Sequence, residues 1–181
     1  PFTRMINGAA DYTICYFDKR LKTTHAHQLA ASLVFYSPLQ TIFWYDKPSF
    51  YHGEPEMEWF ENLQTVFDDT KVLDGAPGKN ITMARRKGQE WFVAAMTNNE
   101  GSEEEIPLTF LDKEKNYLAC IYTDGGEKIK TSTQVKCTYL LVNASQTMKF
   151  QLKPSGGAAI RLVPIDRQKM KKYKKYKGER L

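Results

Sequence analysis

The chain has 181 residues, of which 13% are aromatic, and a formal net charge of +5. This length suits one domain, or a small domain with part of another, and the aromatic content excludes a disordered chain. No apolar run approaches the ~18–20 residues that a membrane-spanning helix needs. The N-terminus lacks the pattern of a secretory signal peptide, so we expect any export signal to lie upstream of Pro1.

The positive charge is concentrated at the C-terminus. Residues 167–181 contain eight Lys or Arg and one Glu, a net charge of +7, which leaves residues 1–166 with a net charge of −2. We expect residues 166–181 to form a disordered basic tail. A solvated extension and a tail that binds nucleic acid or an anionic membrane both fit this composition, although the acidic body disfavours nucleic acid as the main partner.

Residues 1–68 alternate between predicted strands and predicted helices. Residues 2–7 are expected to form a strand, and residues 25–36, preceded by Thr24, form a helix that is apolar on nearly every side. A second strand is predicted at 39–46, and a second helix at 53–67. The order strand–helix–strand–helix implies parallel strands, but two such units cannot cover both faces of a sheet. Residues 1–68 therefore read as the C-terminal end of a (β/α)8 barrel.

The pattern changes near residues 69–78. Short runs of β-forming residues then alternate with turn signals, and Lys87 and Gly88 mark a hairpin. The expected strands are residues 80–86, 90–97, 106–110, 116–124, 137–142, 147–152 and 157–163. Seven strands with little helix between them predict an antiparallel β-sandwich over residues 69–165. The expected fold class is α/β plus all-β: the last two βα units of a (β/α)8 barrel followed by an antiparallel β-sandwich.

The histidines and cysteines give weak signals. His25 and His27 lie two positions apart, and on a helix such side chains point in different directions and cannot bind one metal ion together. We expect these histidines to pack in the core or to cap the helix. Cys120 and Cys137 lie in predicted strands and could meet across a sheet, either as a disulfide or, more simply, as buried thiols. We therefore predict no metal ligand within this chain.

Two aspartates are the best candidates for ligand binding. Chemistry in a βα barrel lies at the C-terminal ends of its strands. Asp11 follows the predicted strand at residues 2–7, and Asp46 follows the next strand. Asp11 could accept hydrogen bonds from sugar hydroxyls, or it could cap a turn or pair with Arg4. Residues 103–105 are all glutamate, and we expect them to form a solvated loop.

Several blocks of sequence resemble one known family when they are taken in order. They read PFTRMINGAADYT, TTHAHQLA, SPLQ, KVLDGAPGKNITMARRKGQEWFVAAMTN and GGAAIRL, and they extend from Pro1 to about Pro164. Blocks in the right order and spacing are far more specific than any single motif. The chain is similar to the C-terminal portion of glycoside hydrolase family 97.

That resemblance implies a periplasmic hydrolase of terminal α-linked glucose or galactose, with an N-terminal β-sandwich, a (β/α)8 barrel and a C-terminal β-sandwich. Two carboxyl groups carry the reaction, and a calcium ion bound by glutamates lies in the active site. In the family these groups precede the PFTR block, so we assign no catalytic residue and no metal ligand here. Arg4, Asp11 and Asp46 are the expected substrate-binding residues.

The sequence differs from the family pattern at two positions, and a second function is also compatible with it. The family more often has prolines at the positions of Ala9 and Ile14, so the sugar that the enzyme takes stays open. The expected partners are an oligosaccharide substrate and the rest of the same polypeptide, without which this chain should be inactive. Alternatively, the sandwich is a non-catalytic carbohydrate-binding or structural module, with Trp91, Tyr117 and Tyr122 as possible sugar contacts.

Overall fold

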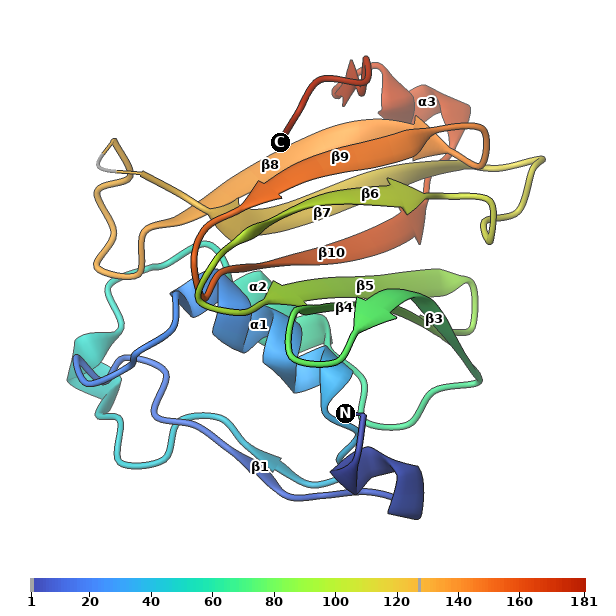
Figure 1. Ribbon diagram of the computed structural model, residues 1–181. Helices are drawn as coiled ribbons and strands as arrows, with labels where there is room; N and C mark the ends of the chain where they lie inside the picture. The colour runs from blue at the N-terminus through green and yellow to red at the C-terminus, as the bar shows by residue number, and fades with distance from the viewer. Residues whose placement is uncertain (1, 127) are drawn as a thin grey trace.

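The computed structural model describes residues 2–126 and 128–181. Strands form most of its ordered structure (Figure 1). The N-terminal part contains the 3₁₀ helix η1 (Arg4–Asn7), strand β1 (Tyr12–Thr13), helix α1 (His25–Val34), strand β2 (Gln40–Thr41), the 3₁₀ helix η2 (Pro48–Phe50) and helix α2 (Met57–Asn62). There follow β3 (Asp69–Ala76), β4 (Asn80–Lys87), β5 (Glu90–Thr97), β6 (Ser102–Pro107), β7 (Asn116–Asp124), β8 (Val135–Asn143), β9 (Thr147–Leu152), β10 (Gly157–Pro164), α3 (Arg167–Met170) and β11 (Lys174–Lys175).

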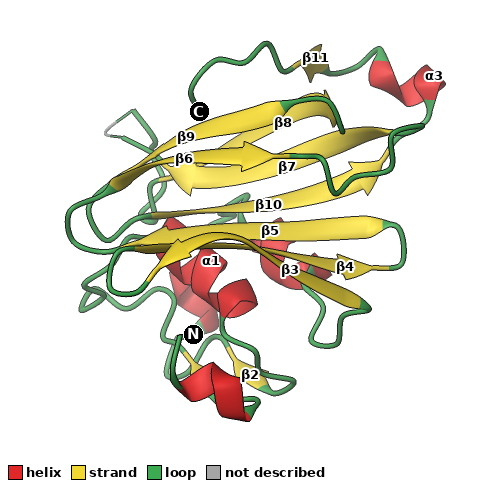
Figure 2. Ribbon diagram, turned by 45° about the vertical axis from the view of Figure 1, so that its right-hand side comes forward, coloured by secondary structure: helices red, strands yellow, loops and turns green. Residues whose placement is uncertain are grey.

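The strands from β3 onward form a β-sandwich. One sheet has seven strands in the order β11-β8-β7-β10-β5-β4-β3, and β6 and β9 pair antiparallel in a second sheet. Figure 2 shows the smaller sheet lying over the larger one. All neighbours in the larger sheet are antiparallel except β11, which runs parallel to β8. The predicted antiparallel sandwich is confirmed, and each of the seven expected strands overlaps one of β4 to β10.

Alternation along the strands produces the core between the two sheets. On β9, Met148, Phe150 and Leu152 are buried, while the residues between them are exposed. They pack with side chains of the larger sheet such as Val93 and Ile160. Successive side chains of a strand point to opposite faces, so a period of two directs one set inward. The hairpin predicted at Lys87 and Gly88 joins β4 to β5, and Gly88 has a φ of +58°.

The N-terminal part covers the other face of the larger sheet. In Figures 1 and 2 helix α1 lies across this face, beneath β10 and β5. Leu29 and Leu33 of α1 belong to the same buried cluster as Phe92 of β5 and Tyr122 of β7. Trp59 of α2 packs edge-on against both aromatic rings, with centroids 5.8 Å from Phe92 and 6.0 Å from Tyr122. The seven-stranded sheet is thus buried on two faces.

The turn between β9 and β10 fixes the N-terminus of α1. Thr24 caps the helix, since its hydroxyl accepts a hydrogen bond from the His27 amide at 3.1 Å. The His27 ring bonds through Nδ1 to the Gly156 carbonyl at 3.0 Å. A Cβ atom on Gly157 would lie 2.8 Å from the His27 Cα atom, so only glycine permits this close approach. A Cβ atom on Gly156 would lie 2.6 Å from the Lys153 carbonyl oxygen, so close packing accounts for both glycines of the GGAAIRL block.

Two expectations for the N-terminal part are wrong in detail. Residues 2–7 do not form a strand: η1 occupies Arg4–Asn7, and the strand follows at Tyr12–Thr13. An extended segment needs a neighbouring strand for its backbone groups, and the described residues offer none to residues 2–7. The second helix is Met57–Asn62, shorter than the predicted 53–67. The β1–α1–β2 unit itself is present, and its strands are parallel, with Tyr12 opposite Gln40.

Two expectations for the sandwich also need correction. Residues 103–105 form part of β6 instead of a loop, and Glu104 is buried between its exposed neighbours. Its carboxylate accepts hydrogen bonds from Asn80 and Thr82 on β4, which is how a charged side chain can face the core. Residues 69–76, for which the sequence predicted no strand, form the edge strand β3 at the start of the sandwich.

The basic tail is ordered, contrary to the expectation. Tyr176 is only 3% exposed, and its amide donates to the Leu141 carbonyl on β8 at 3.0 Å. Its hydroxyl accepts a hydrogen bond from the Lys149 amide at 3.0 Å. Arg180 pairs with Glu103 of β6 at 2.8 Å. The amino-acid composition indicated only that the tail is highly charged. The buried Tyr176 and the backbone pairing of β11 with β8 hold the tail in place.

Candidate functional site

A hollow of about 640 Å³ opens on the N-terminal part, beside strand β2 and helix α2. We call it the aromatic hollow, because phenylalanine and tyrosine rings supply much of its wall. It is lined by Phe17, Gln40, Ile42, Phe43, Asp46, Lys47, Pro48, Tyr51, Met57, Phe60 and Glu61. Apolar walls with a few polar groups are typical of sites for small organic molecules.

A tight turn after β2 places Asp46 in this hollow. The Asp46 amide bonds to the Phe43 carbonyl at 3.2 Å, and Tyr45, between them, has a φ of +62°. A bulky residue rarely adopts such a φ, and strain of this kind is often found at functional sites. One carboxylate oxygen, Oδ2, accepts a hydrogen bond from the Phe17 amide at 3.2 Å. The turn therefore holds the carboxylate in one orientation at the wall of the hollow.

The rings of the aromatic hollow form an ordered cluster. Phe17 and Phe43 are stacked, with centroids 6.0 Å apart and an interplanar angle of 15°. Phe60 meets Phe43 edge-on at 5.8 Å. The negative face of an aromatic ring attracts the weakly positive hydrogens of an apolar surface. A pyranose ring has such a C–H face and a rim of hydroxyl groups, so this cluster and Asp46 together suit a saccharide.

Asp46 and Asp11, two of the three predicted substrate-binding residues, do not line the same hollow. Asp46 lines the aromatic hollow, and Asp11 is exposed and does not line it. Asp11 precedes β1, so the expectation that it follows the C-terminal end of a strand is wrong, because the strand forms later in the sequence than predicted. Arg4 lies in η1, and its side chain is outside the described residues.

Sequence reasoning missed Tyr51, Phe60 and Glu61 as parts of the hollow. Phe60 lies within the predicted second helix, and that prediction gave no reason to look for a ligand. Glu61 is exposed on the last turn of α2. The two residues are consecutive, and neighbouring positions on a helix do not face each other, so their spacing gave no signal for a shared site.

Three glutamates lie at the junction between the N-terminal part and the sandwich: Glu54, Glu56 and Glu58. Tyr16 donates its hydroxyl hydrogen bond to Glu56 Oε1 at 3.2 Å. Glu56 is fully buried, and its other oxygen, Oε2, has no hydrogen-bond partner among the described residues. Burial raises the pKa of the Glu56 carboxyl above its usual range. These glutamates lie within the predicted second helix, residues 53–67, and were not among the predicted site residues.

Glu58 and Glu54 link the same junction to the sandwich. Tyr122 and Tyr139 both donate to Glu58 Oε2, at 3.1 and 2.9 Å. The Glu54 carboxylate accepts hydrogen bonds from the His52 amide at 2.7 Å and from the Ser132 hydroxyl, in the segment between β7 and β8, at 3.5 Å. Glu58 and Glu54 therefore help to hold α2 and the segment before it on the sandwich, which gives these two acids a structural role.

The remaining candidates are structural. His25 packs edge-on against Tyr16 at 5.1 Å, and burial lowers the pKa of both His25 and His27, so the prediction that they pack or cap is confirmed. Cys120 and Cys137 are free thiols. The described residues contain no group of three or more His, Cys, Asp or Glu that could hold a metal ion. Within residues 2–126 and 128–181, no helix has the length and hydropathy needed to cross a bilayer.

The sandwich aromatics are part of the core. Trp91 is 5% exposed, Tyr117 2% and Tyr122 not exposed at all. A side chain that is buried in this way has no face to offer a sugar. The suggestion that these three residues bind carbohydrate is therefore wrong. Trp91 and Tyr117 face the core between the two sheets, and Tyr122 is covered by the N-terminal part on the other face of the larger sheet.

Comparison with known proteins places the chain in a family. The family described as "Glycosyl-hydrolase 97 C-terminal, oligomerisation" matches residues 66–163. A retaining alpha-galactosidase from Bacteroides thetaiotaomicron is 33% identical over 176 residues, which cover 90% of this chain and 26% of that protein. A probable retaining alpha-galactosidase from Streptomyces bingchenggensis is 26% identical, over 88% of this chain and 24% of that protein.

Solved structures agree with this placement. A glycoside hydrolase family 97 enzyme from Pseudoalteromonas sp. strain K8, in complex with acarbose, has 33% identity and a TM-score of 0.71, over 80% of this chain and 23% of that one. A beta-arabinopyranosidase has 25% identity and a TM-score of 0.61, over 77% of this chain and 21% of that one. The chain spans about a quarter of the length of these relatives. It belongs to glycoside hydrolase family 97, and its sequence corresponds to the C-terminal portion of that family.

Proposed function

We propose that this chain is the C-terminal part of a glycoside hydrolase that cleaves terminal α-linked galactose or glucose from saccharides. The single observation that carries the proposal is the 33% identity to a retaining alpha-galactosidase over 90% of this chain. The family 97 structure in complex with acarbose has the same identity, and we keep glucose beside galactose as a candidate sugar. Two relatives are described as retaining, which favours retention of configuration.

We also propose that residues 1–68 are the last two βα units of a (β/α)8 barrel. The support is the parallel β1–α1–β2 unit, in which each strand has only two residues. Among the side chains that the structure describes, seven of the ten large hydrophobic ones that are exposed lie within residues 36–51. Exposed apolar patches of this kind mark surfaces that another part of a protein covers. Barrel strands and helices supplied by the preceding polypeptide would cover it.

In this proposal the chain contributes to substrate binding and not to bond cleavage. A retaining glycosidase uses one carboxyl group as nucleophile and another as acid and then base, held about 5–5.5 Å apart. We place both groups, and the glutamates for a calcium ion, in polypeptide upstream of Pro1. Asp46 would accept hydrogen bonds from sugar hydroxyls, while Phe17 and Phe43 exclude water from the apolar face of the ring. Asp11 and Arg4 remain proposed substrate-binding residues, and the proposed location is the periplasm.

The full-length protein provides the test. We expect Asp46→Asn to lower kcat/KM on aryl α-galactosides or α-glucosides by about 10- to 100-fold, the value of a hydrogen bond to a charged group. Glu100→Gln, an exposed change in the sandwich, should leave kcat/KM unchanged and serves as the control. If the unaltered full-length protein hydrolyses neither substrate, the proposed activity is contradicted. Residues 1–181 alone should give no turnover.

A non-catalytic carbohydrate-binding or structural module is the alternative. In this alternative the sugar would bind in the aromatic hollow, because the aromatic side chains suggested as sugar contacts on the sandwich are buried. Titration of the full-length protein with oligosaccharides separates the two. Saturable binding with no hydrolysis of any α-linked substrate would favour the module.

A further inference from the structure

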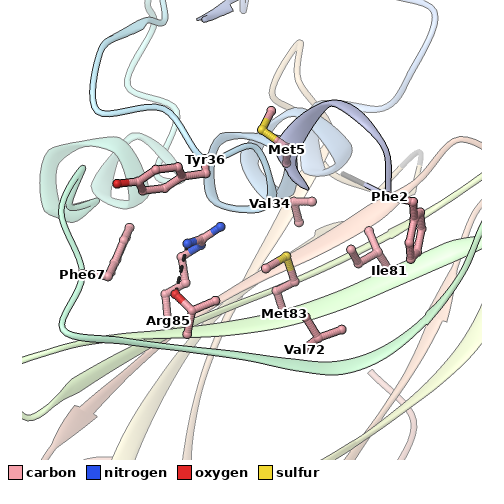
Figure 3. A pocket seen from close by; sticks show the side chains of 10 residues that line it. Phe2, Met5, Val34, Tyr36, Phe67, Val72, Ile81, Met83 and Arg85 are labelled. Carbon is pink, nitrogen blue, oxygen red and sulfur yellow. Dashed lines mark hydrogen bonds between the residues drawn. The ribbon is translucent and has the colours of Figure 1, made fainter. Parts of the chain in front are cut away.

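A second hollow, of about 610 Å³, lies where the N-terminal part meets β3 and β4. We call it the Arg85 hollow. Figure 3 shows the Arg85 side chain extending from β4 into it, toward Tyr36. Apart from Thr70, the other residues on its wall are aromatic or aliphatic, among them Met83 and Val72. An arginine is the one charged group in an otherwise apolar space.

The Arg85 guanidinium is buried without a counter-ion. The residue is 6% exposed, and its ring neighbours are Tyr36, with a centroid 5.5 Å away, and Phe67, at 5.7 Å. Nε donates to the Leu33 carbonyl at 3.0 Å and one terminal nitrogen donates to Thr70 Oγ1 at 3.1 Å. None of the ion pairs among the described residues includes Arg85.

This arrangement is unusual for a charged side chain. A guanidinium has five N–H donors, and two of them are used by the described residues. Buried charges in proteins are normally paired, because their removal from water is expensive. Burial also lowers the pKa of Arg85, and no carboxylate offsets that effect. The remaining donors are therefore available for an acceptor that comes from outside the described residues.

Its neighbour Arg86 shows what a satisfied arginine looks like on the same strand. Arg86 points to the other face of the sheet, where it lies 3.8 Å from an Asp68 oxygen and donates to the Gly88 carbonyl at 2.9 Å. Its side chain is about one-third exposed, with a relative accessibility of 35%. An arginine on β4 can therefore have a carboxylate nearby. Arg85 lacks one because the described residues that line its hollow include no Asp or Glu.

We propose that the Arg85 hollow is the docking site for an acidic segment of the same polypeptide, outside residues 1–181, which inserts an apolar side chain into the hollow and a carboxylate toward Arg85. A carboxylate fits the planar fork of a guanidinium with two parallel hydrogen bonds. An apolar neighbour on the same segment fits the aliphatic wall. The inference rests on the proposed function in one respect, that a longer polypeptide exists.

Two observations favour a segment of the same polypeptide over a second copy of the chain. The relatives are about four times as long as this chain, since it spans 26% of one and 23% of another. Tyr36, which packs on Arg85, is also one of the seven exposed apolar residues within 36–51. The Arg85 hollow is thus continuous with the surface that the preceding polypeptide is proposed to cover. A covalently linked segment also has a high effective concentration at that surface.

Photo-cross-linking in the full-length protein tests this. A photoreactive phenylalanine analogue at Val72, which lines the hollow and is 63% exposed, should cross-link to a peptide from upstream of Pro1 that contains Asp or Glu. The same analogue at Lys71, which lies over Trp91 on the opposite face of β3, should not give that product. Mixed isotope-labelled and unlabelled subunits identify any cross-link between copies.

The arginine itself is then varied. Arg85→Met should reduce the upstream cross-link by about tenfold, as expected for loss of a charge-assisted hydrogen bond, and Arg86→Met should leave it unchanged. If Arg85→Met does not fold, Arg85→Glu combined with an Arg at the cross-linked acid should restore the product. A cross-link only within residues 1–181, only between copies, or unchanged in Arg85→Met would overturn the proposal.

One preparation separates this inference from the proposed activity. Hydrolysis of aryl α-galactosides or α-glucosides without an upstream cross-link would overturn the docking site alone. An upstream cross-link in a full-length protein that hydrolyses neither substrate would overturn the activity alone.

Discussion

The sandwich and the N-terminal part differ in how each buries its apolar side chains. The sandwich has a core between its own two sheets, formed by residues such as Phe150 and Ile160. The N-terminal part buries α1 and Trp59 against the sandwich, but leaves most side chains of residues 36–51 in contact with solvent. The core between the two sheets is closed by the sandwich itself, whereas the N-terminal part has one face covered by the larger sheet and one open face.

The difference follows from the kind of sheet that each region contains. An antiparallel sheet can be built from hairpins, in which short turns bring neighbours together, and β4 to β5 shows this. A parallel sheet is normally covered on both faces and needs several strands. Strands β1 and β2 pair in parallel and are joined through the single helix α1. No third strand among the described residues extends this two-stranded sheet. Hairpins between neighbouring strands can therefore form a whole sandwich from this stretch of sequence, whereas two parallel strands cannot form a whole barrel.

The largest expected effect is in the sandwich core. Phe150→Ala should lower the free energy of unfolding by about 3–5 kcal/mol, because it leaves a cavity beside Ile160 in a fully packed core. Leu39→Ala, at a side chain that is 72% exposed, should change it by less than about 0.5 kcal/mol in the 181-residue chain. Denaturant unfolding followed by circular dichroism measures both.

The same two variants in the full-length protein sharpen the comparison. If preceding polypeptide covers residues 36–51, Leu39→Ala should become costly there, by about 2 kcal/mol or more, as for a buried leucine. The cost of Phe150→Ala should not depend on the length of the protein. A Leu39 effect that stays small in the longer protein would show that the open face is a true surface, and the barrel proposal would fail.

The junction between the two regions should respond to pH. Burial raises the pKa of Glu56, so the folded protein keeps a proton on this carboxyl at pH values where the unfolded chain has lost it. The contribution is fully present below the usual pKa of glutamate. It is lost as the pH rises through the raised value, so the free energy of unfolding should fall over that interval.

Glu56→Gln should remove that fall and make the protein more stable than the wild type above the raised pKa. A glutamine keeps the acceptor for Tyr16 while it cannot take a charge. Thermal unfolding from pH 4 to 8 checks this, with Glu100→Gln as an exposed control. Parallel pH profiles for Glu56→Gln and wild type would show that the Glu56 carboxyl has the same pKa in the folded and unfolded states.

Local patterns in the sequence predicted most of the sandwich. Runs of β-forming residues between turn signals located β4, β5 and β9, and the hairpin at Gly88 appeared where the turn residues indicated it. The strand β6 was placed a few residues too late, because three consecutive glutamates suggested a loop. Glu104 faces inward only because Asn80 and Thr82, far away in sequence, supply hydrogen bonds. A partner on another strand is not visible in a run of glutamates.

The candidate site was predicted less well than the fold. Asp46 was found, since an acid after a strand is a local signal, but Phe60 and Glu61 come from a helix that packs beside it only in three dimensions. Asp11 was misplaced because η1 replaces the strand that was expected at residues 2–7. Arg85 gave no signal at all. Its importance depends on burial and on the lack of a described counter-ion, and neither property can be read from the letters ARRKG.

A further predicted effect concerns the start of helix α1, which packs on the sandwich. The Thr24 hydroxyl caps the helix by accepting a hydrogen bond from the His27 amide. Thr24→Ala removes this cap and should lower the free energy of unfolding by about 1 kcal/mol, the typical cost of a lost helix cap. Thr24→Ser keeps the hydroxyl and should recover most of that loss. Because the cap acts on α1 and on no strand, hydrogen exchange should increase in α1 while the strands keep their protection. Equal losses of protection in α1 and in β9 would instead mean that the two regions unfold as one unit, and the contrast between them would then concern burial alone and not stability.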